Sequence, residues 1–266
     1  MAALGAVLLL MIPFQAQLVF PAHAVGPPGP LPRGAVRVRV EAADGNTLHG
    51  VHIPSLSAAA KPRTLVLGFG GNAWNGSDVA AHLHRHFPHA DVVVFHYRGY
   101  APSTGSPSAE ALLADAPLVH DQAVALVRPD WTIAVGFSIG SAVAASLARR
   151  RPLDGLILVT PFDSLKAAAG DLYPWLPVAM FFEHELDTAV FVRDAPVPVA
   201  MIAGARDTLI RPARTAALRN QVTNLVYDRT IDGAGHNDIY SRPEFGRAMH
   251  EAFALMGPPG TSEAGR

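Results

Sequence analysis

Short, uninterrupted runs of apolar residues recur along this chain, and they constrain its fold more than any other feature. A strand with one wet face alternates polar and apolar residues, whereas a strand buried on both faces is continuously apolar, as in parallel sheets. The runs are Leu65–Leu67, Val92–Phe95, Ile133–Val135, Leu156–Val159 and Val199–Ile202. The sequence therefore predicts a mostly parallel sheet that is covered on both faces.

Segments with helical character separate these runs. They are Val79–Phe87, Ala109–Val127, Ile139–Arg150, Arg214–Gln221 and Glu244–Met256. Alternation of strands and helices implies right-handed crossovers and an α/β fold with helices on both faces of the sheet. Pro117 predicts a bend or break in the second helix, because proline removes a helical hydrogen bond.

An antiparallel hairpin is expected before the first buried run. Val36, Val38 and Val40 alternate with charged residues, as in a strand with one wet face. Asp44-Gly45 is a tight-turn signal, and Thr47–Ile53 is the predicted returning strand.

Composition narrows the function classes. The 266 residues are half hydrophobic and 16% charged, which suits one large ordered domain. A formal net charge of −1 provides no electrostatic footprint for nucleic acid, so no nucleic-acid partner is expected. The chain has no cysteine, which excludes disulfide scaffolds, thiolate zinc sites and cysteine nucleophiles.

The two ends are predicted to lie outside the fold. Ala2–Phe14 is apolar and uncharged, and Ala22-His23-Ala24 fits a signal-peptidase site, so the segment is a signal peptide or a membrane anchor. The protein is then exported (periplasmic or secreted) or anchored at its N-terminus, and cytoplasmic if the start codon is mis-assigned. Gly26–Pro32 completes residues 1–32 as a Pro/Gly linker that is dispensable for the sheet. A single domain over 33–256 and a disordered tail over 257–266 follow.

The segment 163–194 is rich in apolar and aromatic residues but contains no strand pattern. It is predicted to be a small helical cap over the carboxyl ends of the strands, where open α/β sheets bind ligands. A packed helical insertion without a role at the site is the alternative. Trp74, Trp131 and Trp175 are interpreted as packing residues, and for Trp74 and Trp175 the lining of an acyl pocket is the alternative.

Gly136-Phe137-Ser138-Ile139-Gly140 lies between a predicted strand and a predicted helix. A nucleophile on such a sharp turn has strained backbone geometry and needs small neighbours two residues away on each side. The turn exposes the Ser138 hydroxyl at a helix N-terminus, where developing negative charge is favoured.

Serine needs a base, and the base needs an orienting acid. His236 stands in a glycine-rich loop after the strand-like Leu225–Ile231, and Asp207 follows the strand Val199–Ile202. The order Ser138, Asp207, His236 is that of α/β-hydrolases. Asp163 is the alternative acid, since it also follows a strand.

Stabilising a tetrahedral oxyanion requires backbone donors beside the nucleophile. The predicted donors are the N–H of Ile139, directly after Ser138, and the N–H of Asn72, in the glycine-rich loop Gly68–Asn75.

Several motifs together resemble the α/β-hydrolase superfamily, in particular its serine aminopeptidase-like branch of α/β-hydrolase domain proteins with a reduced cap. They are Gly71–Ala73, Tyr97–Tyr100, the segment around Ser138, Pro161–Leu165, Tyr173–Pro177, Gly204–Asp207 and Gly233–Asn237. Two positions depart from the pattern: Gly70 stands where the family usually has histidine, and Ala101 where a glycine is common.

These residues predict a serine hydrolase that cleaves a small-molecule carboxylic ester through an acyl-enzyme, with no cofactor or metal. By the resemblance, an amide or short peptide is the alternative substrate, and a non-catalytic scaffold is the alternative class. N-terminal membrane association is compatible with the apolar start. Four histidines (His82, His84, His86 and His89) are interpreted as a solvated helix surface rather than a metal site.

Overall fold

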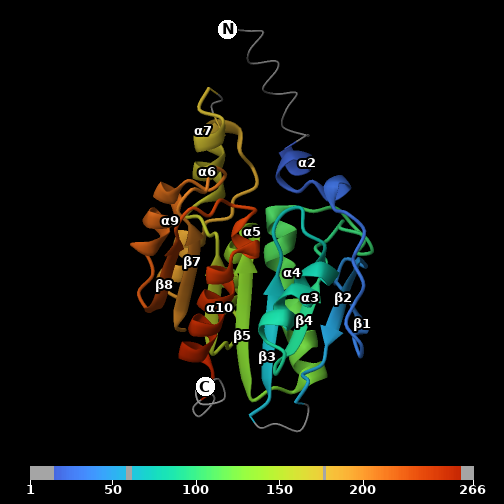
Figure 1. Ribbon diagram of the computed structural model, residues 1–266. Helices are drawn as coiled ribbons and strands as arrows, with labels where there is room; N and C mark the ends of the chain where they lie inside the picture. The colour runs from blue at the N-terminus through green and yellow to red at the C-terminus, as the bar shows by residue number, and fades with distance from the viewer. Residues whose placement is uncertain (1–14, 58–61, 176–177, 259–266) are drawn as a thin grey trace.

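A mostly parallel sheet forms the centre of the computed structural model, which describes residues 15–57, 62–175 and 178–258 (Figure 1). In the described residues the sheet has eight strands in the order β1-β2-β4-β3-β5-β6-β7-β8. β2 runs antiparallel to both β1 and β4, and every other neighbouring pair is parallel. The strands are β1 (Val36–Glu41), β2 (Thr47–Ile53), β3 (Thr64–Phe69), β4 (Asp91–Phe95), β5 (Trp131–Phe137), β6 (Gly155–Val159), β7 (Val199–Gly204) and β8 (Leu225–Ile231).

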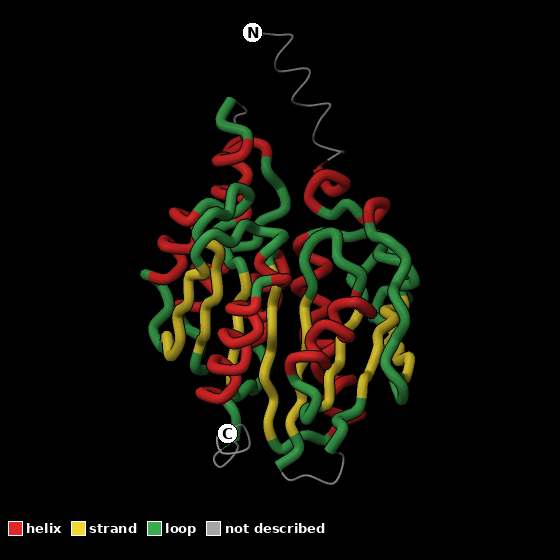
Figure 2. Tube along the Cα trace, viewed as in Figure 1, coloured by secondary structure: helices red, strands yellow, loops and turns green. Residues whose placement is uncertain are grey.

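Helices cover both faces of this sheet, which confirms the predicted fold class (Figures 1 and 2). The α-helices are α2 (Gln15–Val19), α3 (Gly76–His86), α4 (Ala109–Val127), α5 (Ile139–Ala148), α6 (Leu165–Leu172), α7 (Val178–Phe181), α8 (Thr188–Arg193), α9 (Pro212–Arg219) and α10 (Pro243–Met256). Two short 3₁₀ turns, η2 (Ala22–Ala24) and η3 (Ile239–Ser241), complete the described elements.

Two hydrophobic cores lie on opposite faces of the sheet. Leu65 and Leu67 of β3 pack with α4 and α5 on one side, whereas Val66 packs with α3 and α10 on the other. Successive side chains of a strand point to opposite faces, so a strand between two helical layers must be apolar at every position. This double burial is the physical reason for the uninterrupted apolar runs.

Two helices differ from their predicted limits or shape. α3 begins at Gly76, earlier than predicted, because the side chain of Asn75 caps it by accepting a hydrogen bond from the Ser77 N–H at 2.9 Å. α4 is one unbroken helix through Pro117, so the predicted break does not occur. Packing of Leu112 and Ala116 in the core holds this helix together although Pro117 lacks an N–H.

Part of the segment 163–194, which the sequence predicts to be a cap, belongs to the main body. An isolated antiparallel bridge between Ser164 and Asp187 joins its two ends. α8 packs against α5 and is therefore part of the helical layer of the main body. The remaining part, between Ser164 and Asp187, contains α6 and α7 and is called the cap below. It lies at the end of the sheet toward which the parallel strands point (Figure 1).

The N-terminal segment also differs from the prediction, which placed residues 1–32 outside the fold. Phe20 is 1% exposed and belongs to the same hydrophobic core as residues of α4 and α5. Further along, Asn75 Nδ2 donates to the Gly26 carbonyl at 3.1 Å, and Gly29 N–H donates to Asp78 Oδ1 at 2.8 Å. Residues 15–32 contain no strand, but they are packed on the domain because apolar side chains such as Phe20 fill space that the sheet and helices leave open.

Some predictions about the ends fall on residues that the structure does not describe. The apolar stretch Ala2–Phe14 and most of the predicted tail, 259–266, lie outside the described ranges. Within residues 15–57, 62–175 and 178–258, every helix is too short or too polar to cross a bilayer.

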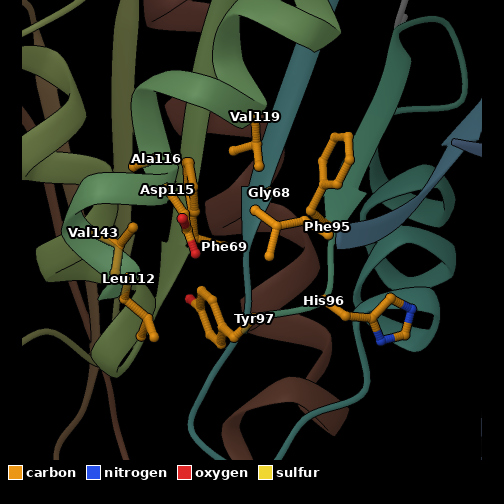
Figure 3. A pocket seen from close by; sticks show the side chains of 11 residues that line it. Gly68, Phe69, Phe95, His96, Tyr97, Leu112, Asp115, Ala116, Val119 and Val143 are labelled. Atoms are coloured by element: carbon orange, nitrogen blue, oxygen red, sulfur yellow. The ribbon is translucent and has the colours of Figure 1, made fainter. Parts of the chain in front are cut away.

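A small pocket of about 20 Å³ lies between α4 and the sheet (Figure 3). Leu112, Ala116 and Val119 of α4 line it together with Gly68 of β3. A void of this size holds about one water molecule. Neither Ser138 nor His236 lines this pocket, so it lies apart from the candidate active site.

Candidate active site

The turn between β5 and α5 holds Ser138 in strained backbone geometry. Its φ is +52°, which is unusual for a residue with a side chain. A Cβ on Gly136 would lie 2.6 Å from the Gly140 carbonyl carbon, and one on Gly140 would lie 2.6 Å from the Gly70 oxygen. Only glycine fits at either position, which is the steric reason for the spacing seen in the sequence.

Ser138, His236 and Asp207 form a continuous chain of hydrogen bonds. His236 Nε2 lies 3.1 Å from Ser138 Oγ, and His236 Nδ1 lies 2.7 Å from Asp207 Oδ2. All three residues are buried, and they come from the ends of β5 and β7 and from the loop after β8. With Nδ1–H directed at the carboxylate, Nε2 is free to accept the serine proton.

The backbone of the following loop holds Asp207 in place. Its Oδ1 accepts hydrogen bonds from the Leu209 N–H at 2.9 Å and the Ile210 N–H at 2.7 Å. One oxygen is thus fixed by the loop while the other faces His236.

Asp163, the alternative acid, has a different partner. Its Oδ2 pairs with Arg214 Nη1 at 3.2 Å, and its backbone carbonyl accepts from the Ala189 N–H at 2.9 Å. The structure therefore brings Asp207, and not Asp163, to His236.

The glycine-rich loop after β3 lies directly beside the nucleophile. A Cβ on Gly71 would lie 3.9 Å from the Cβ of Ser138. Asn72 and Ile139 both line the cavity into which Ser138 opens. In the described part of the chain neither of their backbone N–H groups donates to another protein group, so both are available to a ligand.

Two tyrosines from another part of the chain support this loop. The family usually has a histidine within the loop, at the position of Gly70. Tyr97 Oη donates to the Gly70 carbonyl at 2.8 Å, and Tyr100 Oη donates to the Asn72 carbonyl. Burial raises the pKa of the Tyr97 hydroxyl well above its usual value, which keeps it a neutral donor. These bonds fix the backbone at Gly70 and Asn72 without a side chain at Gly70.

A cavity of about 410 Å³ opens at Ser138 between the cap and the N-terminal segment. Its described lining is apolar apart from a few uncharged polar groups and contains no charged side chain. The residues are Gln15, Leu18, Val19, Asn72, Ser138, Ile139, Phe162, Leu165, Ala168, Ala169, Leu172, Tyr173, Trp175, Val178, Phe181, Phe182, Leu209 and Ile210.

Sequence reasoning missed part of this lining. Trp74 packs against His82 and Phe137, as the preferred interpretation has it, whereas Trp175 lines the cavity, which was the alternative. The sequence pattern does not predict that Leu18 and Val19 of α2 line the cavity, because their segment has the composition of a leader. Their apolar character is visible in the sequence, but nothing local shows that they return to the site.

The prediction of a solvated histidine surface is wrong for two of the four residues, whereas His86 is half-buried and His89, beyond the end of α3, is exposed. His82 and His84 are buried, and the His82 ring lies against those of Trp74 and Tyr240. Burial lowers the pKa of His82 to about 3, so its ring is neutral. In the described residues no three His, Asp or Glu side chains are placed to hold a metal ion together.

Three features define the class of α/β-hydrolases: the sheet topology, the sharp turn Gly136–Gly140 that carries Ser138 (the elbow), and the Ser–His–Asp arrangement. A profile of the family described as "alpha/beta hydrolase fold" matches residues 65–191. An uncharacterized protein of Mycobacterium tuberculosis is 33% identical over 223 residues, covering 81% of this chain and 76% of that protein. The chain belongs to the α/β-hydrolase superfamily.

Other relatives carry functional names. The lysophosphatidylserine lipase ABHD12 of Danio rerio is 25% identical, and the match covers 64% of this chain and 52% of the lipase. The Pyrococcus furiosus esterase structure superposes with a TM-score of 0.67 at 18% identity, covering 88% of this chain and 98% of the esterase. An α/β-hydrolase of Vibrio vulnificus has a TM-score of 0.67 at 17% identity, covering 91% and 89%. At these identities the structural matches concern the fold.

Proposed function

We propose that this protein is a serine hydrolase that cleaves carboxylic esters through an acyl-enzyme. The observation that carries the proposal is the hydrogen-bond chain from Asp207 through His236 to Ser138, which ends in a 410 Å³ apolar cavity. A nucleophile, a base and an orienting acid are the groups that acyl transfer requires.

In the proposed mechanism Ser138 Oγ attacks the ester carbonyl carbon while His236 Nε2 takes its proton. The imidazolium that forms is stabilised by the Asp207 carboxylate at Nδ1. His236 then gives the proton to the leaving alkoxide, which departs as the alcohol and leaves an acyl-serine. A water molecule, deprotonated by the same nitrogen, releases the carboxylic acid and restores Ser138.

Negative charge on the tetrahedral intermediate is held by the backbone N–H groups of Asn72 and Ile139. Their place beside Ser138 and their lack of protein acceptors in the described chain support this role. Removing one such donor typically costs about 2.7–4 kcal/mol of transition-state stabilisation.

The cavity lining favours an ester with an apolar acyl group over a short peptide. A peptide with free ends carries charges, and no charged side chain among the described lining residues would pair with them. The name of one relative, a lysophosphatidylserine lipase, also supports an ester. The hydrogen bonds joining Ser138, His236 and Asp207 argue against a non-catalytic scaffold.

The proposal extends to the location of the protein. We propose that Ala2–Phe14, which is apolar and uncharged, directs export or anchors the chain at a membrane. Gln15 follows directly and lines the cavity, so an anchor there would hold the substrate site near the lipid surface.

Covalent labelling with a fluorophosphonate tests the reaction. The wild-type protein is expected to be labelled and to hydrolyse nitrophenyl esters, and Ser138→Ala is expected to lose both properties with an unchanged circular dichroism spectrum. Ser106→Ala, at an exposed serine, is the matched control and keeps both. Undiminished turnover by folded Ser138→Ala would refute the assignment.

A further inference from the structure

We propose that the N-terminal segment Gln15–Phe20 is a wall of the substrate cavity that selects esters by acyl-chain length. The inference rests on the proposed esterase function. It adds residues that determine substrate specificity, and these residues come from a segment whose sequence is typical of a leader. Figure 1 shows α2 at the same end of the sheet as α6 and α7.

Polar contacts attach this segment to the cap. Gln15 Nε2 donates to the Phe181 carbonyl at 2.7 Å, and Gln15 Oε1 accepts from the Glu183 N–H at 3.2 Å. One side-chain amide thus binds both a carbonyl and an N–H of the cap backbone. This pairing fixes the position of α2 relative to α7.

Apolar packing holds the other end of the segment. Phe20 is 1% exposed within the main core, and its ring meets that of His184 edge-on at 5.3 Å. A phenylalanine buried this completely does not belong to a freely detached leader.

The segment also contacts the glycine-rich loop Gly68–Asn75, which carries the predicted oxyanion donor Asn72. Asn72 Nδ2 donates to the Val19 carbonyl at 3.4 Å, and Leu18 and Val19 line the cavity together with Ser138. The cavity is therefore enclosed between three parts of the chain: the elbow, the cap and the N-terminal segment.

This arrangement makes chain length the property that the wall controls. Each methylene group that is buried against apolar side chains improves binding about fourfold, as long as the cavity continues. Filling the cavity from the side of α2 shortens the usable length, so long acyl chains lose this gain while short ones have little to lose.

Leu18→Trp and Val19→Trp test the wall by filling the cavity. The measured quantity is the ratio of kcat/KM for a nitrophenyl decanoate to that for a nitrophenyl butyrate. We expect the ratio to fall at least about tenfold in either variant, with Leu18→Trp the safer one for folding because Leu18 is 62% exposed. Leu56→Trp, at a 72% exposed leucine that does not line the cavity, is the control and leaves the ratio unchanged.

The outcomes separate this inference from the proposed function. If the wild type is labelled by fluorophosphonate and both tryptophan variants keep the wild-type ratio, the wall is wrong and the esterase stands. If the wild type is not labelled, the esterase proposal fails and the wall with it.

The mass of the mature protein gives an independent test. Cleavage after Ala24 would remove Gln15, Leu18, Val19 and Phe20 together. The intact mass of active protein, expressed from the whole chain in a host that exports it, is expected to include residues 15–24. Active protein that begins at Val25 would overturn the inference, because its cavity would lack this wall.

Discussion

Ser138 is buried, and its side chain nevertheless lines a cavity that is large enough for a substrate. Its φ of +52° is a strained conformation for a residue with a side chain, and Gly136 and Gly140 leave the room that the turn needs. Burial places the Ser138–His236–Asp207 chain in surroundings of low dielectric, where each hydrogen bond is electrostatically stronger than in water.

The identity of the acid is tested by comparing two isosteric changes. Asp207→Asn is expected to lower kcat by about 10⁴, because His236 then loses the carboxylate that sets its tautomer and stabilises its charge. Asp163→Asn, the matched control, should have a much smaller effect, since Asp163 pairs with Arg214. Steady-state kinetics on one nitrophenyl ester distinguish the two, and the reverse order of effects would place the acid after β6.

At the scale of elements, α3 contains a second buried polar feature that the mechanism does not use. Arg85 Nη2 donates to His82 Nδ1 at 3.1 Å, which leaves the proton of the neutral ring on Nε2. That nitrogen is buried and has no hydrogen-bond partner in the described residues. An unsatisfied buried donor of this kind costs about 1–3 kcal/mol.

The pH dependence of stability follows from these histidines. Burial lowers the pKa of His82 to about 3 and that of His86 to about 4, whereas both titrate near 6.5 when unfolded. Between pH 6.5 and about 4 the unfolded chain therefore binds more protons than the folded one, and the free energy of unfolding falls as the pH falls.

His82→Phe removes both the titrating ring and the unpaired Nε2 from α3. We expect a higher free energy of unfolding at pH 5, by about 1–3 kcal/mol, and a weaker loss between pH 7 and pH 5. Urea denaturation at the two pH values measures both quantities. His23→Phe, at an exposed position, serves as the control, and a His82→Phe protein with the wild-type pH dependence would contradict the explanation.

The cap is expected to affect substrate preference more than stability. Trp175 lines the cavity but is 75% exposed, so Trp175→Ala creates no void in the core. Its melting temperature should remain within about 2 °C of the wild type, whereas the preference among nitrophenyl esters of different chain lengths should change several-fold. A large drop in melting temperature with an unchanged preference would show that the segment is only structural.

For the whole molecule, the exposed apolar side chains around the cavity gather at one end. Leu18 of α2 is 62% exposed, Trp175 of the cap is 75% exposed, and Met180 of α7 is 77% exposed. Leu18 and Trp175 line the cavity, and Gln15 binds the Phe181 carbonyl next to Met180. The apolar stretch Ala2–Phe14 joins the molecule at this end, directly before α2.

This apolar end predicts association with a lipid surface. The double variant Trp175→Ser/Met180→Ser should co-sediment with phosphatidylcholine vesicles at least about tenfold less than the wild type, since each large apolar side chain contributes about 1.5–3 kcal/mol on burial. Leu56→Ser is the control, because Leu56 lies at the other end of the sheet from the cavity. It follows the end of β2 at Ile53, which pairs with Val92 near the start of β4. Equal sedimentation of the double variant and the wild type would refute lipid contact at this end.

Local sequence is sufficient to predict the sheet and two of the three side chains that meet at the candidate site. Strands between two helical layers must be apolar throughout, so the runs along the chain predicted β3 to β7, and the Gly136–Gly140 spacing marked the elbow because only glycine clears the turn. His236 is a candidate on a weaker pattern, since it stands in a glycine-rich turn after a strand.

Tertiary structure alone decided which separated segments meet. Asp163 and Asp207 both follow strands, and only the placement of β7 and its loop brings Asp207 to His236. The histidines of α3 are buried by Trp74 and Tyr240, which no periodicity within α3 reveals. The segment Gln15–Phe20 has the composition of a leader, yet it packs between the cap and the sheet, because the free energy of burying Phe20 depends on a space that other parts of the chain create.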